Sequence, residues 1–157
     1  MNYPTTTAIL AGGLIAGTID IGVASAINQA HPLLLLQAIA SGALGRSSYQ
    51  GGLATSALGL VLQEGMSVII AALFVLAAWR LRVLTDRWIL AGLAYGVPIY
   101  LVMNFIVYPL SNAVPALHFT VPGVIINVAA MQLFGLIIAG SARLVIGRSG
   151  RSVPMPA

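Results

Sequence analysis

Two carboxylic acids, Asp20 and Glu64, lie in the middle of long apolar stretches of this 157-residue chain. The chain has only three acidic residues in total, and the third is Asp86. A carboxylate at bilayer depth costs roughly 2.5 to 3.5 kcal/mol on insertion scales, so it usually faces the interior of a helix bundle and marks a pathway or a site. Because no Arg or Lys lies within these stretches, we expect the pair to share a proton or to hold a cation between them.

The acids have a structural interpretation as well as a functional one. In the structural interpretation, each protonated acid bonds across helices and serves assembly alone, as interhelical polar contacts often do in membranes. In the functional interpretation, Asp20 and Glu64 carry a proton or a small cation, and further polar residues line the approach to them. The expected pathway-lining residues are Asn104, Asn127, Gln132 and Tyr100.

Several kinds of chemistry are excluded or disfavoured by what the chain lacks. It has no Cys, so disulfides, thiolate metal sites and thiol nucleophiles are excluded. It contains no nucleophile elbow, zincin pattern, P-loop or dinucleotide fingerprint, so an enzyme is not expected. His31 and His118 fall in predicted loops on one side, and two His without a third ligand make a poor metal site. We therefore predict no catalytic residues, no cofactor and no metal.

Composition indicates an integral membrane protein with an all-α fold. Hydrophobic residues make up 59% of the chain, charged residues 6%, and the mean hydropathy is +1.01. About 20 apolar residues in a helix cross a bilayer core of ~30 Å. The four stretches that meet this test are 8–29, 53–79, 88–110 and 120–142. We predict one transmembrane domain over residues 1–146 and a flexible cytoplasmic tail over 147–157.

A fifth apolar stretch, about residues 33–45, is too short to cross a bilayer. It lies between Pro32 and the glycines at 51 and 52, and it is predicted to be a re-entrant or interfacial helix. Helical spacing places Leu33, Leu36, Ala40 and Leu44 on one face. We expect this face to cap the bundle or to line a mouth.

The arginines predict how the chain is oriented. All seven basic residues are Arg; three lie between the second and third spans, three follow the fourth span, and only Arg46 lies in the loops on the other side. The positive-inside rule then places both termini in the cytoplasm. Since the arginines are scattered among apolar spans, nucleic acid is not an expected partner, and the bilayer is.

Small residues recur at a spacing of four on two of the spans. Gly13 and Gly17 lie on the first span, and Gly92 and Gly96 lie on the third. This small-xxx-small pattern allows two helix backbones to approach closely in lipid. The glycines are therefore predicted to pack helices together, either within the chain or against a second copy or another membrane protein.

Several short motifs are shared with a known group of proteins. The run from Leu36 to Gly45, the Gly51-Gly52 pair, the stretch Tyr100-Leu101-Val102-Met103-Asn104 and the triplet Pro109-Leu110-Ser111 resemble a family of small uncharacterised bacterial inner-membrane proteins. The resemblance implies a four-helix integral membrane fold in the inner (plasma) membrane and carries no assigned activity.

Two hypotheses of different classes follow for function. The first is a small, oligomeric unit that binds or conducts a proton or cation through Asp20 and Glu64. The second is a non-transporting accessory or assembly subunit whose glycine faces pack against a partner membrane protein.

Overall fold

The computed structural model describes residues 3–113 and 120–149, and within these ranges the chain is helical without a strand. The predicted all-α class is confirmed. Four helices are long and apolar enough to cross a membrane, as predicted: Thr5–Asn28, Gly52–Arg80, Trp88–Leu110 and Val121–Val145. They belong to α1 (Tyr3–Asn28), α3 (Gly52–Arg80), the segment that begins with α5 (Trp88–Val102), and α7 (Val121–Ser149).

The first corner of the chain follows from its local sequence. Gln29, with φ of 50°, adopts the left-handed conformation that commonly ends a helix. His31 then caps α2 (Pro32–Leu44), because its Nδ1 accepts a hydrogen bond of 3.3 Å from the backbone N–H of Leu33. Pro32 occupies the first helical position, where its missing N–H costs nothing. A short 3₁₀ turn, η1 (Gly45–Gln50), leads from α2 into α3.

The third span is irregular. After α5, which contains Pro98, the chain forms the π-helix η2 (Met103–Val107) and then the short α6 (Tyr108–Leu110). A π turn inserts an extra residue into the helix and often occurs at functional sites. The span is joined to α3 by α4 (Val83–Asp86).

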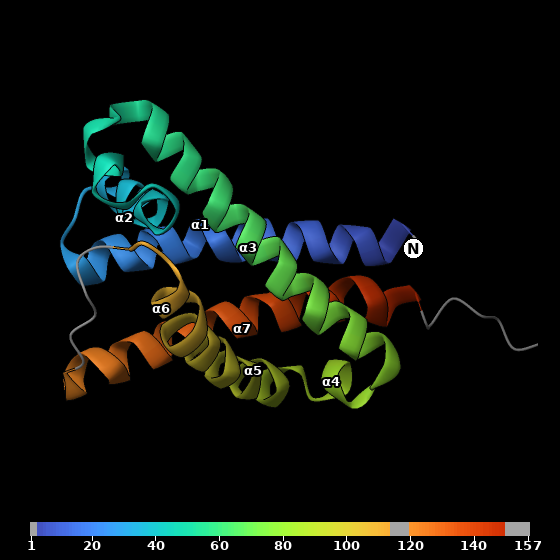
Figure 1. Ribbon diagram of the computed structural model, residues 1–157. Coiled ribbons are helices and arrows are strands. Elements are labelled where there is room, and N and C mark those ends of the chain that lie inside the picture. Colours follow the sequence, from blue (N-terminus) through green and yellow to red (C-terminus); the bar gives the residue numbers. More distant parts are fainter. Residues whose placement is uncertain (1–2, 114–119, 150–157) are drawn as a thin grey trace, which may run out of the picture.

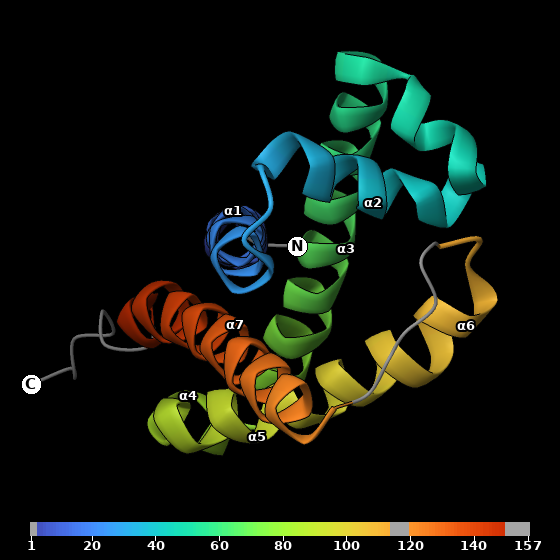
Figure 2. The ribbon, with the colours of Figure 1, turned by 90° about the vertical axis from the view of Figure 1, so that its left-hand side faces the viewer.

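The long helices form an open bundle (Figures 1 and 2). Helix α7 packs against α1 on one side and α5 on the other, while α3 crosses α1 and carries α2. The start of α1, α4 and the end of α7 lie at one end of the molecule, and α2 lies at the other (Figure 1). The spans therefore alternate in direction.

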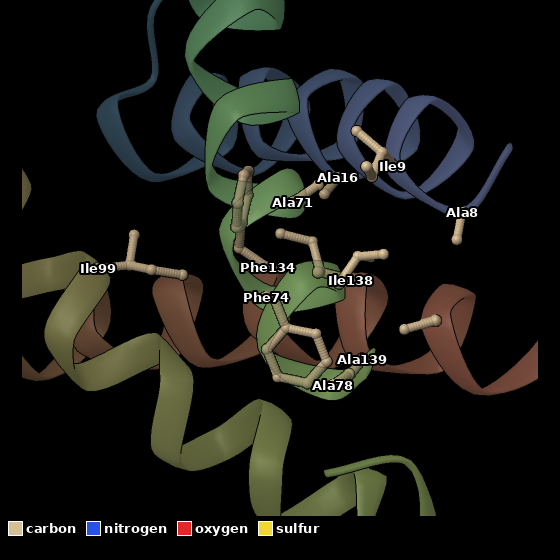
Figure 3. Packing of buried hydrophobic residues seen from close by; sticks show 12 residues of the cluster. Ala8, Ile9, Ala16, Ala71, Phe74, Ala78, Ile99, Phe134, Ile138 and Ala139 are labelled. Atoms are coloured by element: carbon tan, nitrogen blue, oxygen red, sulfur yellow. The ribbon is translucent and has the colours of Figure 1, made fainter. Parts of the chain in front are cut away.

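The core lies where α1, α3 and α7 meet (Figure 3). It is built largely from small side chains, among them Ala16, Ala71 and Ala139, with Phe74 and Ile138 between the helices. Close approach through small residues is how helices associate where lipid removes the hydrophobic driving force.

The outward faces of the spans are apolar and exposed. Val61 is 67% exposed, Leu90 is 62% exposed and Ile125 is 63% exposed. An apolar exterior of this extent is expected for helices that face lipid, and the structure is compatible with an integral membrane protein.

Helix α2 packs across the first turns of α3 with a face that differs from the predicted one. Leu36 and Ala40 are buried as expected, but Leu33 and Leu44 are exposed. The buried face is completed by Gln37 and Ser41. Polar groups pack inward here because they find hydrogen-bond partners. Gln37 Nε2 donates a hydrogen bond of 3.0 Å to the Gly52 carbonyl, and Ser56 Oγ on α3 donates one of 3.1 Å to the Leu33 carbonyl.

The end of α7 overlaps the start of the predicted tail. Helix α7 continues to Ser149, so residues 147–149 are helical rather than part of an irregular tail. The remainder of the predicted tail, 150–157, lies outside the described residues, as does His118. A helix outlasts its apolar period when nothing in the sequence breaks it, and neither Gly147 nor Arg148 does so.

Candidate functional site

A cavity of about 90 Å³ lies within the bundle and takes its walls from all four long segments. This volume is enough for a few water molecules or a small cation with part of its hydration shell. The lining residues are Asp20, Gln63, Met66, Ser67, Ile70, Ile99, Tyr100, Met103, Asn104, Asn127, Met131 and Phe134. The cavity thus combines one carboxylate with several neutral polar side chains and an apolar remainder.

Asp20 is partly buried and is held by the neighbouring helix. Gln63 on α3 donates a hydrogen bond of 2.8 Å from Nε2 to Asp20 Oδ2. This amide fixes one carboxylate oxygen, which leaves Oδ1 as the oxygen without a bond from the described residues. The carboxylate is therefore oriented by α3 while it borders the cavity.

Glu64 occupies a different place. Its Oε1 accepts a hydrogen bond of 3.0 Å from Thr18 Oγ1 on α1. Its Oε2 is buried and has no hydrogen-bond partner among the described residues. A Cβ added to Gly17 would lie 2.6 Å from Oε2 and 2.7 Å from Ser67 Oγ, so a larger residue here would require these side chains to shift.

The predicted acid pair is not seen. Asp20 bonds to Gln63 and lines the cavity, whereas Glu64 bonds to Thr18 and is absent from the cavity wall. The prediction was wrong because equal depth along two helices does not fix the direction in which each side chain points. Successive helical residues turn by about 100°, so Thr18 and Asp20 lie on opposite sides of Gly17 on the α1 surface.

Three of the four predicted pathway residues reach the cavity. Tyr100 and Asn104 come from the third span and Asn127 comes from α7. Asn104 Nδ2 donates a hydrogen bond of 2.9 Å to the Tyr100 carbonyl, and Asn127 Nδ2 donates one of 2.9 Å to the Gly123 carbonyl. Each amide nitrogen uses one of its two N–H groups within its own helix, so the amide oxygen can bind a cation and the second N–H can donate to water.

Gln132 does not line the cavity, contrary to the prediction. Its backbone lies against Gly96, where an added Cβ would be 2.6 Å from Gln132 N and 2.6 Å from the Met131 carbonyl oxygen. The cavity brings Asp20, Asn104 and Asn127 together without Gln132.

The predicted packing glycines all make close contacts within the chain. A Cβ on Gly13 would lie 2.7 Å from Val68 Cα on α3, and one on Gly92 would lie 2.8 Å from Leu136 Cα on α7. Gly17 and Gly96 contact the same two partner helices. These faces are thus occupied by the chain's own helices, which leaves none of the four glycines to pack against a separate protein.

Two features of the site had no counterpart in the sequence prediction. The π-helix η2 places Met103 and Asn104 at its start, where both line the cavity. Methionines at positions 66, 103 and 131 contribute to the wall from three different segments. The prolines at 98 and 109 are the available sequence signal for the irregular span, because each lacks the N–H that a regular helix would use.

The cavity wall carries no positive charge. None of its residues is Arg, Lys or His, so the wall has nothing to neutralise Asp20 when the carboxyl is ionised. Among the described residues, no group of three or more His, Cys, Asp or Glu could hold a metal ion. Any cation in this cavity would therefore bind through one carboxylate and neutral groups.

Comparison with family models, with curated proteins and with solved structures finds no match to this chain in any of the three. The family resemblance drawn from short motifs accordingly stays a prediction.

Proposed function

We propose that this protein is a small membrane unit that binds a proton or a small cation at Asp20, as a step in its permeation. The observation that carries the proposal is the placement of the carboxylate at a cavity lined by neutral polar groups and lacking a basic residue. A lone carboxylate at membrane depth is costly when ionised and unpaired. A proton or a bound cation removes that cost.

The surrounding groups suit a cation better than an anion. The cavity wall has a carboxylate and no basic residue, and the amide oxygens of Asn104 and Asn127 can coordinate a cation, since each amide nitrogen spends one N–H within its own helix. Carbonyl and carboxylate oxygens carry negative charge or partial charge and coordinate cations rather than anions. The hydroxyls of Tyr100 and Ser67 lie on the same wall and can accept or relay a proton.

Glu64 takes a structural role in this proposal. It is seated between α1 and α3 at Gly17 and bonds to Thr18. We place the working charge on Asp20 alone, which replaces the two-acid carrier expected from the sequence.

The setting in the membrane is proposed on charge placement. The arginines at 80, 82, 87 and 143 lie at the end of the bundle where α1 begins, and Arg46 lies near the other end. The positive-inside rule then puts both termini in the cytoplasm of a bacterial inner membrane, with α2 re-entrant or interfacial on the outer side. Reporter fusions at each terminus and within η1, at residue 47, test this orientation. The two termini are expected to report the cytoplasmic side, and the fusion at residue 47 the opposite side.

The test is ion flux into liposomes that contain the purified protein. A pH-sensitive dye inside the liposomes reports proton entry, and ion-sensitive dyes report the entry of alkali, divalent and silver(I) ions under their own gradients. Asp20→Asn is expected to abolish flux. Glu64→Gln is the matched control, because it removes the same charge from the neighbouring helix without altering the cavity wall, and it is expected to retain flux.

Two outcomes would contradict the proposal. Equal flux in wild type and Asp20→Asn would exclude Asp20 as the binding group. A folded wild-type protein that passes no ion in any gradient would favour the non-transporting accessory or assembly role.

A further inference from the structure

The three methionines that line the cavity come from separate parts of the fold. Met66 belongs to α3, Met103 begins η2, and Met131 belongs to α7. The chain has five methionines in all, and the other two, Met1 and Met155, lie outside the described residues. Every methionine in the described part of the chain therefore borders the same cavity as Asp20.

Packing alone gives a weaker account of this arrangement. Methionine often fills irregular gaps in a core. Here the fully buried core where the helices meet is built from Ala, Ile, Phe and Val, and Met103 and Met131 pack against it as partly buried residues. All three methionines also border open space: they line the cavity, and Met66 and Met103 line the apolar groove beside it as well.

The chemistry of the thioether narrows the class of cation. Soft sulfur ligands favour copper(I) and similar ions over hard cations such as Mg²⁺ or Ca²⁺. A thioether is neutral at every pH, so binding through it requires no deprotonation, in contrast to a thiolate. With no Cys in the chain, methionine is its only sulfur ligand.

Charge balance favours a monovalent ion. The single negative charge of Asp20 balances one positive charge, and the other ligands are neutral, so the site with a monovalent ion has no net charge. A divalent ion in the same place would leave a net charge of one unit inside an apolar bundle, and an uncompensated buried charge is costly.

We propose that the cavity binds a soft monovalent cation, copper(I) or silver(I), through the thioethers of Met66, Met103 and Met131, with Asp20 as its counter-charge. This names the cation class of the permeation unit and rests on that proposed function. The site needs no change in oxidation state of the ion, because the protein supplies ligands and charge only.

The test uses silver(I), which does not require a reductant, added to detergent-purified full-length protein in chloride-free nitrate buffer. Binding is followed by calorimetry, and X-ray absorption at the silver edge reports whether sulfur surrounds the ion. The variants are Met66→Leu, Met103→Leu, Met131→Leu, the triple variant and Asp20→Asn. Leu is close to Met in volume, so the fold is expected to survive. Ile99→Leu is the matched control, since it alters the same wall without removing a sulfur.

Each single substitution is expected to weaken silver binding at least about tenfold, the lower end of what even an outer-shell partner contributes to a metal site. The triple variant should lose the sulfur signal, and Ile99→Leu should retain both binding and signal. Silver bound with the same affinity in the triple variant, or bound without a sulfur signal in wild type, would overturn the inference.

The outcome is separable from that of the proposed function. Proton or alkali flux that depends on Asp20, together with silver binding that ignores the methionines, would leave the function standing and remove only the soft-ion site. Silver binding and flux that both ignore Asp20 would remove both proposals.

Discussion

Gln63 on α3 donates a hydrogen bond of 2.8 Å from its Nε2 to Oδ2 of Asp20 on α1. This contact joins two spans, and both of its residues line the cavity. A charge in a low-dielectric site is directed by such partners, so the amide is expected to matter to binding as well as to assembly.

The first prediction concerns this amide. Gln63→Leu leaves Asp20 without its donor and is expected to weaken cation binding about 10- to 100-fold, the range typical of outer-shell partners. Gln37→Leu is the control. The Gln37 amide donates a hydrogen bond of 3.0 Å to the Gly52 carbonyl, and this contact lies away from the cavity. The control is expected to lower stability without altering affinity. Calorimetric titration of both variants checks the prediction, and equal affinity in wild type and Gln63→Leu would count against it.

Hydropathy sufficed to predict the spans, whereas the site depended on side-chain directions that a single sequence does not give. The four apolar helices and their alternation follow from composition, since lipid permits few alternatives to a helix. The inward position of Asp20 follows from the cost of burying its charge. The hydrogen-bond partner of Asp20 could not be predicted from its depth in the membrane. Thr18 and Asp20 point about 200° apart around α1, and Glu64 bonds to Thr18 rather than to Asp20.

The irregular third span was also beyond the sequence reasoning. Pro98 predicts a kink, but it does not specify that the chain forms a π-helix over Met103–Val107. Periodicity assumes a regular helix, so it does not predict this turn, whose first two residues line the cavity.

A second prediction assigns Glu64 to assembly. Thr18→Val removes the hydroxyl that donates 3.0 Å to Glu64 Oε1. Because Oε2 already has no partner, the carboxyl would then lack a donor altogether. The expected loss in unfolding free energy is about 1 kcal/mol, within the range measured for interhelical hydrogen bonds in membranes. Thermal melting in detergent measures it.

The control for Thr18 is another threonine on the same helix. Thr7 Oγ1 donates a hydrogen bond of 2.9 Å to the Tyr3 carbonyl, one turn earlier in α1. This bond stays within α1 and connects no second helix. Thr7→Val should therefore melt close to wild type. Matching melting temperatures for the two valine variants would show that the contact between Thr18 and Glu64 does not stabilise the bundle.

A third prediction concerns the crossing of α1 and α3. A Cβ on Gly13 would lie 2.7 Å from Val68 Cα, which is backbone and cannot rotate away. Gly13→Ala is therefore expected to destabilise the protein by about 1 to 3 kcal/mol, the usual cost of overpacking. Gly22→Ala is the control on the same helix, because nothing lies within 4 Å of its added Cβ.

The two alanine variants should change stability in opposite directions. Alanine is favoured over glycine in a helix by roughly 1 kcal/mol, so Gly22→Ala should match or exceed wild type in melting temperature. If Gly13→Ala instead remained as stable as Gly22→Ala, the close approach of the two backbones at Gly13 would be refuted.

The last prediction concerns how α2 is held on α3. A Cβ on Gly59 would collide with the Leu36 carbonyl oxygen, so Gly59→Val is expected to force α2 away from α3. The hydrogen bond of 3.1 Å from Ser56 Oγ to the Leu33 carbonyl would be lost with it. Gly65→Val lies on the same helix with nothing within 4 Å of its added Cβ, and it is the matched control. Hydrogen exchange should show faster exchange across residues 33–44 in Gly59→Val alone. Protection of that segment in both variants would mean that α2 docks by other contacts, since a helix of this length has little stability of its own when detached.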